Sequence, residues 1–204
     1  MSTTALFIGD SITDAGRRTD PSGHLGAGYV RHIAAITAGN SIEIVNRGIG
    51  GDRICDLRRR WDEDCLQLAP DVVTILVGVN DTWRRYTEND PTTADSYRHD
   101  YIDIVKRTQD AGISQIIILE PFVIPINAEQ RTWKSDDLDA KRAVAREIAD
   151  EHGLLFIPLQ TILADAITDD DPHTVVEDGV HPSAVGHETI AHAWLQHARA
   201  LLSV

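Results

Sequence analysis

The chain has 204 residues, 42% of them hydrophobic, which suffices for one domain with a substantial core and no disulfide or metal cross-links. Its 32 Asp and Glu residues outnumber its 19 Lys and Arg residues and give a formal net charge of -13. This charge repels the phosphate backbone of a nucleic acid and an anionic membrane surface, so we expect neither as a partner.

Neither a leader nor a membrane span is predicted, since a span needs roughly 18 or more consecutive apolar residues. Cys55 and Cys65 are the only cysteines, and on one helix they would lie about 15 Å apart, too far to form a disulfide. Free thiols are typical of a reducing compartment. We therefore expect a soluble, cytoplasmic protein.

Short apolar runs alternate with longer amphipathic stretches along the whole chain. The runs predict five β-strands, at Ala5 to Gly9, Ile42 to Asn46, Val72 to Val77, Gln115 to Glu120 and Leu154 to Pro158. Helical spacing of apolar residues predicts helices that contain Ile54, Leu57, Trp61, Cys65 and Leu68, then Val144, Ala145 and Ile148, and finally Ile190, Trp194, Ala198 and Leu201. Strands that are apolar throughout and joined by helices indicate a parallel sheet between two helix layers. With no repeat or linker in view, residues 1–204 are predicted to form a single α/β domain.

The chemistry of such a sheet is expected beyond the carboxyl ends of its strands, where ligands bind. Polar and glycine-rich segments follow the first three strands there, and another precedes the last helix. These segments are Gly9 to Ser11, Asn46 to Asp52, Gly78 to Asp81 and Glu177 to Pro182.

Ser11, Asp178 and His181 are the residue types of a serine hydrolase. A serine hydroxyl becomes a nucleophile when an imidazole takes its proton, and a carboxylate fixes the tautomer of that imidazole. The backbone N–H of Gly51 and the side-chain amide of Asn80 can bind the oxyanion that forms during acyl transfer. Ser11 alone would more often be a helix N-cap, and Asn80 alone could be a turn residue, but the full set favours catalysis.

In this order the motifs resemble those of the SGNH hydrolases, also called GDSL-type esterases and lipases. The resemblance covers Gly9-Asp10-Ser11-Ile12, Gly51, Asn80 within Gly-Val-Asn-Asp, and Asp178 with His181. It implies a flavodoxin-like three-layer α/β/α sandwich with a five-stranded parallel sheet. It also implies that Ser11, Asp178 and His181 are catalytic, and that the oxyanion hole consists of the N–H groups of Ser11 and Gly51 with the Asn80 amide. One departure is Gly50, where many members carry serine.

We expect no metal and no cofactor. Asp10 is expected to bond the backbone around the serine turn rather than a metal ion. His187 and His192 lie five residues apart, whereas a zinc-protease helix needs two histidines four apart.

Three longer segments resemble the carbohydrate-deacetylating branch of the family, which includes acetylxylan esterases. They are Gly9 to Arg17, Leu25 to Val30 and Asn80 to Arg85. This resemblance implies that the chain removes acetyl groups from a small-molecule substrate, an acetylated xylo-oligosaccharide, through an acyl-enzyme. Trp83 and Arg84 are candidate sugar contacts, because aromatic faces and guanidinium groups suit pyranose rings and hydroxyls. Relatives in this branch often form homo-oligomers, although the sequence fixes no subunit number.

Two alternatives stay open at this point. The same chemistry on longer acyl chains would make the protein a thioesterase or lysophospholipase, which an aromatic content of only 5% disfavours. A non-catalytic flavodoxin-like binding module is also disfavoured, because the strand-end loops lack a phosphate-binding glycine-rich sequence that opens a helix. That alternative would also leave Asp178 and His181 unexplained.

Overall fold

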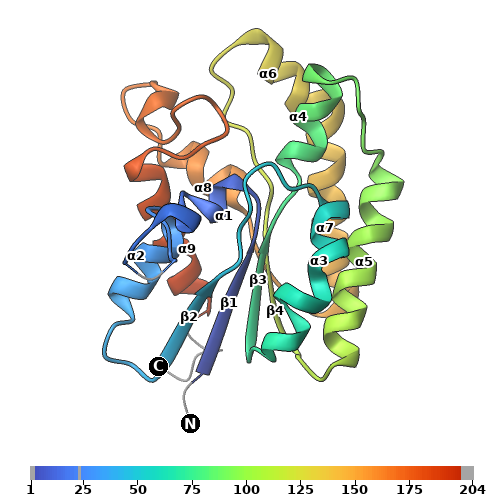
Figure 1. Ribbon diagram of the computed structural model, residues 1–204. Helices are drawn as coiled ribbons and strands as arrows, with labels where there is room; N and C mark the ends of the chain where they lie inside the picture. Colours follow the sequence, from blue (N-terminus) through green and yellow to red (C-terminus); the bar gives the residue numbers. More distant parts are fainter. Residues whose placement is uncertain (1–2, 23, 199–204) are drawn as a thin grey trace.

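A five-stranded parallel sheet forms the centre of the structure (Figure 1), a computed structural model that describes residues 3–22 and 24–198. The strands are β1 (Thr3–Gly9), β2 (Ile42–Asn46), β3 (Val72–Leu76), β4 (Gln115–Leu119) and β5 (Leu155–Ile157). The predicted parallel sheet is thereby confirmed, with β2 at its predicted bounds and the other strand ends within two residues of the prediction. Its order, β2-β1-β3-β4-β5, is that of flavodoxin-like sheets.

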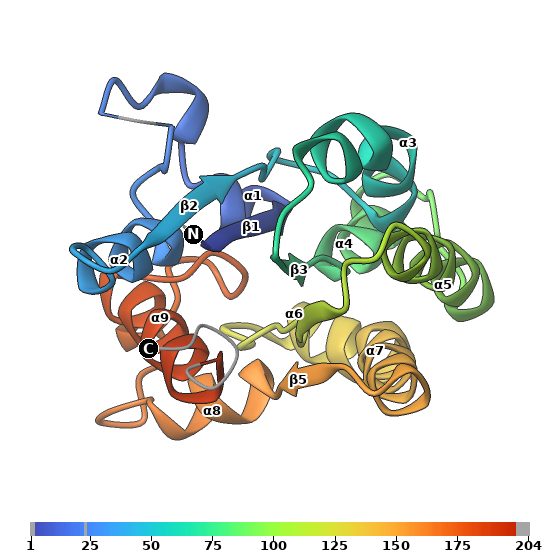
Figure 2. The same ribbon diagram turned by 90° about the horizontal axis from the view of Figure 1, so that it is seen from below.

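Helices cover both faces of the sheet, as the view from below shows (Figure 2). One face carries α2 (Tyr29–Ile36), α8 (Leu159–Asp165) and α9 (Ala184–Ala198), and the other carries α3 (Ile54–Asp64), α5 (Ala94–Asp110) and α7 (Asp139–His152). Shorter helices are α1 (Ser11–Asp14), α4 (Val79–Thr87) and α6 (Ala128–Trp133), with single 3₁₀ turns at Arg17–Thr19, Leu66–Leu68 and Pro172–Thr174 and a π-helix at Lys134–Leu138. The predicted α/β sandwich is therefore correct.

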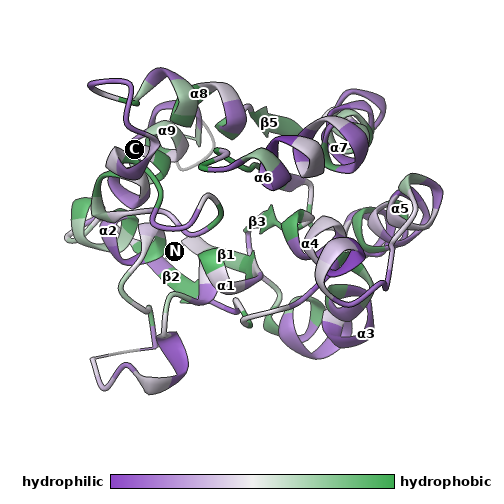
Figure 3. Ribbon diagram, turned by 90° about the horizontal axis from the view of Figure 1, so that it is seen from above, coloured by the Kyte–Doolittle hydropathy of each residue, from purple (hydrophilic) through white to green (hydrophobic). Residues whose placement is uncertain are grey.

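Two apolar cores separate the sheet from its helix layers. Ala5 and Phe7 of β1 are buried in one core, whereas Leu6 and Ile8 are buried in the other. This alternation explains why the strand is apolar at every position from Ala5 to Ile8, because both of its faces are covered there. The strands are accordingly largely hydrophobic in the view from above, whereas the surrounding helices carry hydrophilic residues (Figure 3).

The two tryptophans on apolar helix faces lie in these cores, as predicted. Trp61 donates its indole N–H to Thr108 (2.9 Å), and Trp194 donates to Thr74 (2.9 Å), so neither buried N–H is left unpaired. Leu201, which the periodicity placed on the last helix, lies outside the described residues.

The helix predicted to run through Cys65 and Leu68 ends earlier. α3 stops at Asp64, and Leu66–Leu68 forms a separate 3₁₀ turn before β3. Both cysteines are free thiols, as expected. None of the helices in the described part of the chain is long and apolar enough to cross a membrane.

Candidate active site

The turn after β1 presents Ser11 at the carboxyl edge of the sheet. Gly9 packs so closely against β3 that a Cβ atom there would lie 2.2 Å from the carbonyl oxygen of Leu76. Asp10 caps the short helix α1 by accepting the N–H of Ile12 (3.0 Å), the backbone role expected from the sequence. Burial raises the pKa of Asp10 to about 7. Ser11 is therefore held on a tight strand-to-helix turn.

Ser11, His181 and Asp178 form a continuous hydrogen-bonded chain, although Ser11 and His181 lie 170 positions apart. Oγ of Ser11 is 3.0 Å from Nε2 of His181, and Nδ1 of His181 is 2.7 Å from Oδ2 of Asp178. Partial burial opposes ionisation of Asp178, but hydrogen bonds from His181 and Val180 outweigh it and hold the pKa of this carboxyl below its usual range. Because an ionised carboxylate only accepts, Nδ1 carries the proton, and Nε2 is free to accept one from Ser11.

Gln130, on α6, supports the loop that carries Asp178 and His181. Its Nε2 donates to the carbonyl of Asp178 (2.6 Å), while its Oε1 accepts the N–H of Ile126 (2.9 Å). The side chain also packs against Gly179, whose φ is +92° and where a Cβ atom would lie 2.3 Å from Gln130 Oε1. Sequence reasoning missed Gln130, because no local pattern signals a contact across 48 positions.

The three predicted oxyanion donors, the N–H groups of Ser11 and Gly51 and the amide of Asn80, belong to residues that line one pocket. Among the described residues, no acceptor is bonded to the backbone N–H of Ser11 or of Gly51. Asn80 donates one amide hydrogen to the carbonyl of Asp52 (3.0 Å), which leaves its second hydrogen available. The N–H of Gly50 is occupied, because it donates to the carboxylate of Asp14 (3.0 Å). Of these two neighbouring glycines, Gly51 is therefore the one with an available N–H.

A pocket of about 550 Å³ opens over these groups. Trp83 lies against Trp133 and His181, with ring centroids 5.6 Å and 6.0 Å apart. Arg84 donates from Nη2 to the carbonyl of Gly51 (2.9 Å). The pocket is lined by Ser11, Gly50, Gly51, Asn80, Trp83, Arg84, Thr87, Glu88 and His181. It thus brings together every predicted site residue except Asp178, which lies behind His181.

Thr87 and Glu88 are wall residues that sequence reasoning missed. Thr87 is the last residue of α4 and Glu88 is its C-cap, so they follow Trp83 and Arg84 by four positions, about one helical turn further along the same face. Helical spacing from the predicted sugar contacts was the signal that could have identified them.

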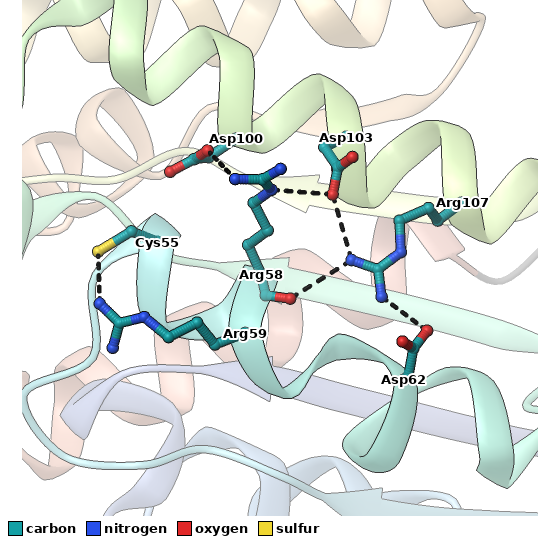
Figure 4. A pocket seen from close by; sticks show the side chains of 7 residues that line it. All are labelled: Cys55, Arg58, Arg59, Asp62, Asp100, Asp103 and Arg107. Carbon is teal, nitrogen blue, oxygen red and sulfur yellow. Dashed lines mark hydrogen bonds and ion pairs between the residues drawn. The ribbon is translucent and has the colours of Figure 1, made fainter.

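A second hollow, of about 500 Å³, lies between α3 and α5 and contains none of the predicted site residues (Figure 4). Its charged side chains pair with one another: Arg58 contacts Asp103 (3.1 Å), and Arg107 contacts Asp62 (2.6 Å). The hydrogen-bonding capacity of this hollow is thus largely used within the protein.

Within residues 3–22 and 24–198, no group of three or more His, Cys, Asp or Glu side chains is placed to hold a metal ion. His187 has a structural contact instead, since its Nδ1 accepts the N–H of Tyr29 (3.2 Å). Burial lowers the pKa of His187 to about 4, which keeps the ring neutral for this contact.

Known proteins share this fold, and their sequences align with this one over most of its length. The chain matches the GDSL-like Lipase/Acylhydrolase family over residues 7–189. It is 34% identical to an acetylxylan esterase from Geobacillus stearothermophilus, over 94% of this chain and 91% of that protein. The crystal structure of Axe2, an acetylxylan esterase from the same organism, has a TM-score of 0.85 at 35% identity and covers 96% of this chain and 93% of that one. An alpha/beta hydrolase from the metagenome of Lake Arreo, Spain, has a TM-score of 0.88 at 28% identity, with 98% of each chain covered.

Proposed function

Because this chain belongs to the GDSL-like lipase/acylhydrolase family and is a carboxylic ester hydrolase, we propose that it removes acetyl groups from carbohydrate hydroxyls, in particular those of xylo-oligosaccharides. The observation that carries the proposal is the series of hydrogen bonds from Ser11 through His181 to Asp178 at the pocket. The acetylxylan esterase relatives supply the substrate class.

In the mechanism that we propose, His181 takes the proton of Ser11 as Oγ attacks the acetyl carbonyl. Asp178 keeps the imidazole in the required tautomer and stabilises its charged form. The N–H groups of Ser11 and Gly51 and the amide of Asn80 bind the developing oxyanion. His181 then protonates the leaving sugar oxygen, which leaves the acetyl group on Ser11 until water, activated by the same imidazole, releases acetate.

The walls of the pocket suit a sugar ester. Its volume of about 550 Å³ suits a small ligand. Trp83 offers an aromatic face for a sugar ring, and Arg84, Thr87 and Glu88 offer hydrogen-bonding groups for hydroxyls.

A cytoplasmic location is part of the proposal, since free Cys55 and Cys65 suit a reducing compartment. The enzyme would then act on short acetylated oligosaccharides inside the cell. Cell fractionation with an antibody against the chain tests this location.

The direct test measures acetate release from acetylated xylo-oligosaccharides by the wild type and by Ser11→Ala, with octanoyl and palmitoyl esters as competing substrates. Ser96→Ala, which changes an exposed serine on α5, is the matched control. We expect Ser11→Ala to lose at least about 10⁴-fold in turnover while the control keeps its activity. Cleavage of long esters with intact sugar acetates would refute the carbohydrate substrate and favour a thioesterase or lysophospholipase.

A further inference from the structure

The N–H group of Gly51 lies at the centre of a tight turn. The carbonyl of Ile49 accepts the N–H of Asp52 (3.2 Å), which closes a four-residue β-turn. Gly51 has a φ of +86°, whereas Gly50 has no positive φ, a combination that marks a type II turn with glycine at its third position. The peptide between Gly50 and Gly51 is the central unit of this turn, and it carries the proposed oxyanion donor.

A type II turn and a type I turn differ mainly in the orientation of this central peptide. Rotation of the peptide from one form to the other turns its N–H to the opposite side. Gly50 and Gly51 have no side chains to oppose such a rotation. Contacts from outside the turn must therefore keep the central peptide in its type II orientation.

Two charged side chains make such contacts, one on each side of the central peptide. Oδ2 of Asp14 accepts the N–H of Gly50 (3.0 Å), which fixes the preceding peptide. Nη2 of Arg84 donates to the carbonyl of Gly51 (2.9 Å), which fixes the following one. Asp14 is buried on α1, three residues after Ser11, and Arg84 lies on α4, four residues after Asn80. The helices that carry the nucleophile and the amide donor thus also hold the turn.

We propose that Arg84 is a positioning residue which, opposite Asp14, locks the Gly50–Gly51 turn in the form that directs the N–H of Gly51 at the oxyanion. The inference rests on the proposed function, because it takes the N–H of Gly51 as an oxyanion donor. It gives Arg84 a role in the chemical step in addition to contact with the sugar. A residue that only binds sugar would not matter for an ester that contains none.

The test compares Arg84→Met, Arg84→Lys and the control Arg85→Met on p-nitrophenyl acetate and on an acetylated xylo-oligosaccharide. Arg85 is the adjacent arginine on α4; it pairs with Asp137 outside the pocket, so the control removes the same charge from the same helix. We expect Arg84→Met to lower kcat by about 10- to 100-fold on both substrates. This decrease does not exceed the one expected when an oxyanion donor is removed altogether, because the N–H of Gly51 is still present. Arg84→Lys should restore part of kcat, since a single donor can reach the carbonyl. The control should keep its kcat.

A loss confined to KM for the sugar substrate, with p-nitrophenyl acetate hydrolysed normally by Arg84→Met, would overturn the inference. A second readout is independent of activity: the ¹⁵N–¹H resonance of the Gly51 amide. We expect this resonance to shift or broaden in Arg84→Met and to stay in place in Arg85→Met, and an unchanged resonance in both variants would also overturn the inference.

Failure of the proposed function gives a different pattern. A wild type that cleaves p-nitrophenyl acetate but leaves sugar acetates intact would refute the substrate, while the variants on p-nitrophenyl acetate still decide the role of Arg84. If Ser11→Ala kept full activity, the site itself would be wrong, and the Gly51 resonance would still show whether Arg84 holds the turn.

Discussion

Asp178→Asn replaces one carboxylate oxygen with an NH₂ group. The surrounding hydrogen bonds decide whether that group takes the place of Oδ1 or of Oδ2. Oδ1 of Asp178 accepts the backbone N–H groups of Val180 (3.0 Å) and His181 (2.8 Å), a task that an NH₂ group cannot perform. The NH₂ group therefore takes the place of Oδ2, which in the wild type lies 2.7 Å from Nδ1 of His181. By donating to Nδ1, it forces the ring proton onto Nε2, so the imidazole can no longer accept the proton of Ser11.

The expected loss is large because the side chain keeps its place while the base is disabled. The wrong histidine tautomer in a serine triad costs about 10⁴-fold in kcat, which corresponds to about 5 kcal/mol on the barrier. Initial rates of the wild type and Asp178→Asn with saturating p-nitrophenyl acetate near neutral pH measure this loss of kcat. Glu177→Gln is the matched control, since it makes the same acid-to-amide change at an exposed neighbour in the loop, and its kcat should not change.

A loss smaller than about tenfold in Asp178→Asn would refute this reasoning. It would mean that the Asp178 carboxylate does not set the tautomer of His181 during the reaction. A loss in Glu177→Gln as large as that in Asp178→Asn would equally refute it, because the effect would then come from the charge of the loop.

Three further predictions concern Asn80, Gln130 and Asp81. Asn80→Ala should lower kcat by about 10²- to 10³-fold with little change in KM, because the amide is proposed to bind only the oxyanion; steady-state kinetics test this, and a pure KM effect would contradict it. Gln130→Glu keeps the acceptor but removes the donor to the Asp178 carbonyl, so urea titration should show about 1–3 kcal/mol lower stability together with a reduced kcat, whereas unchanged values would show that the loop holds without it. Burial raises the pKa of Asp81 to about 7, so the native state holds this proton more tightly than the unfolded state, and the stability of the wild type falls as pH rises from about 4 to above 7. Between pH 5 and pH 8, the free energy of unfolding, measured by urea titration, should fall by roughly 2–3 kcal/mol less in Asp81→Asn than in the wild type. If the substitution changed the free energy of unfolding equally at both pH values, burial of the ionised Asp81 carboxylate would not be the cause.

The sequence by itself determined the sheet, its helix layers and the proposed catalytic set. Strands buried on both faces are apolar at most positions, and helices packed on one side repeat their apolar residues at helical spacing, so both leave a local pattern. Ser11 and Asn80 follow parallel strands, whose carboxyl ends necessarily meet at one edge of a sheet. That they share this edge could be predicted without knowing the strand order, whereas their proximity also requires that β1 and β3 are neighbours.

Tertiary structure alone decided how the donors are directed and held. The sequence resemblance placed the proposed donor at Gly51, and the structure adds that Asp14 occupies the N–H of the neighbouring Gly50, across 36 positions of sequence. The contact from Arg84 on α4 to the turn at Gly51 spans 33 positions and follows no periodic pattern. Side-chain to backbone bonds of this kind depend on the packing of whole elements, because the residues that form them are ordinary in their local context. They leave no signal in a single sequence until the fold has brought its loops together.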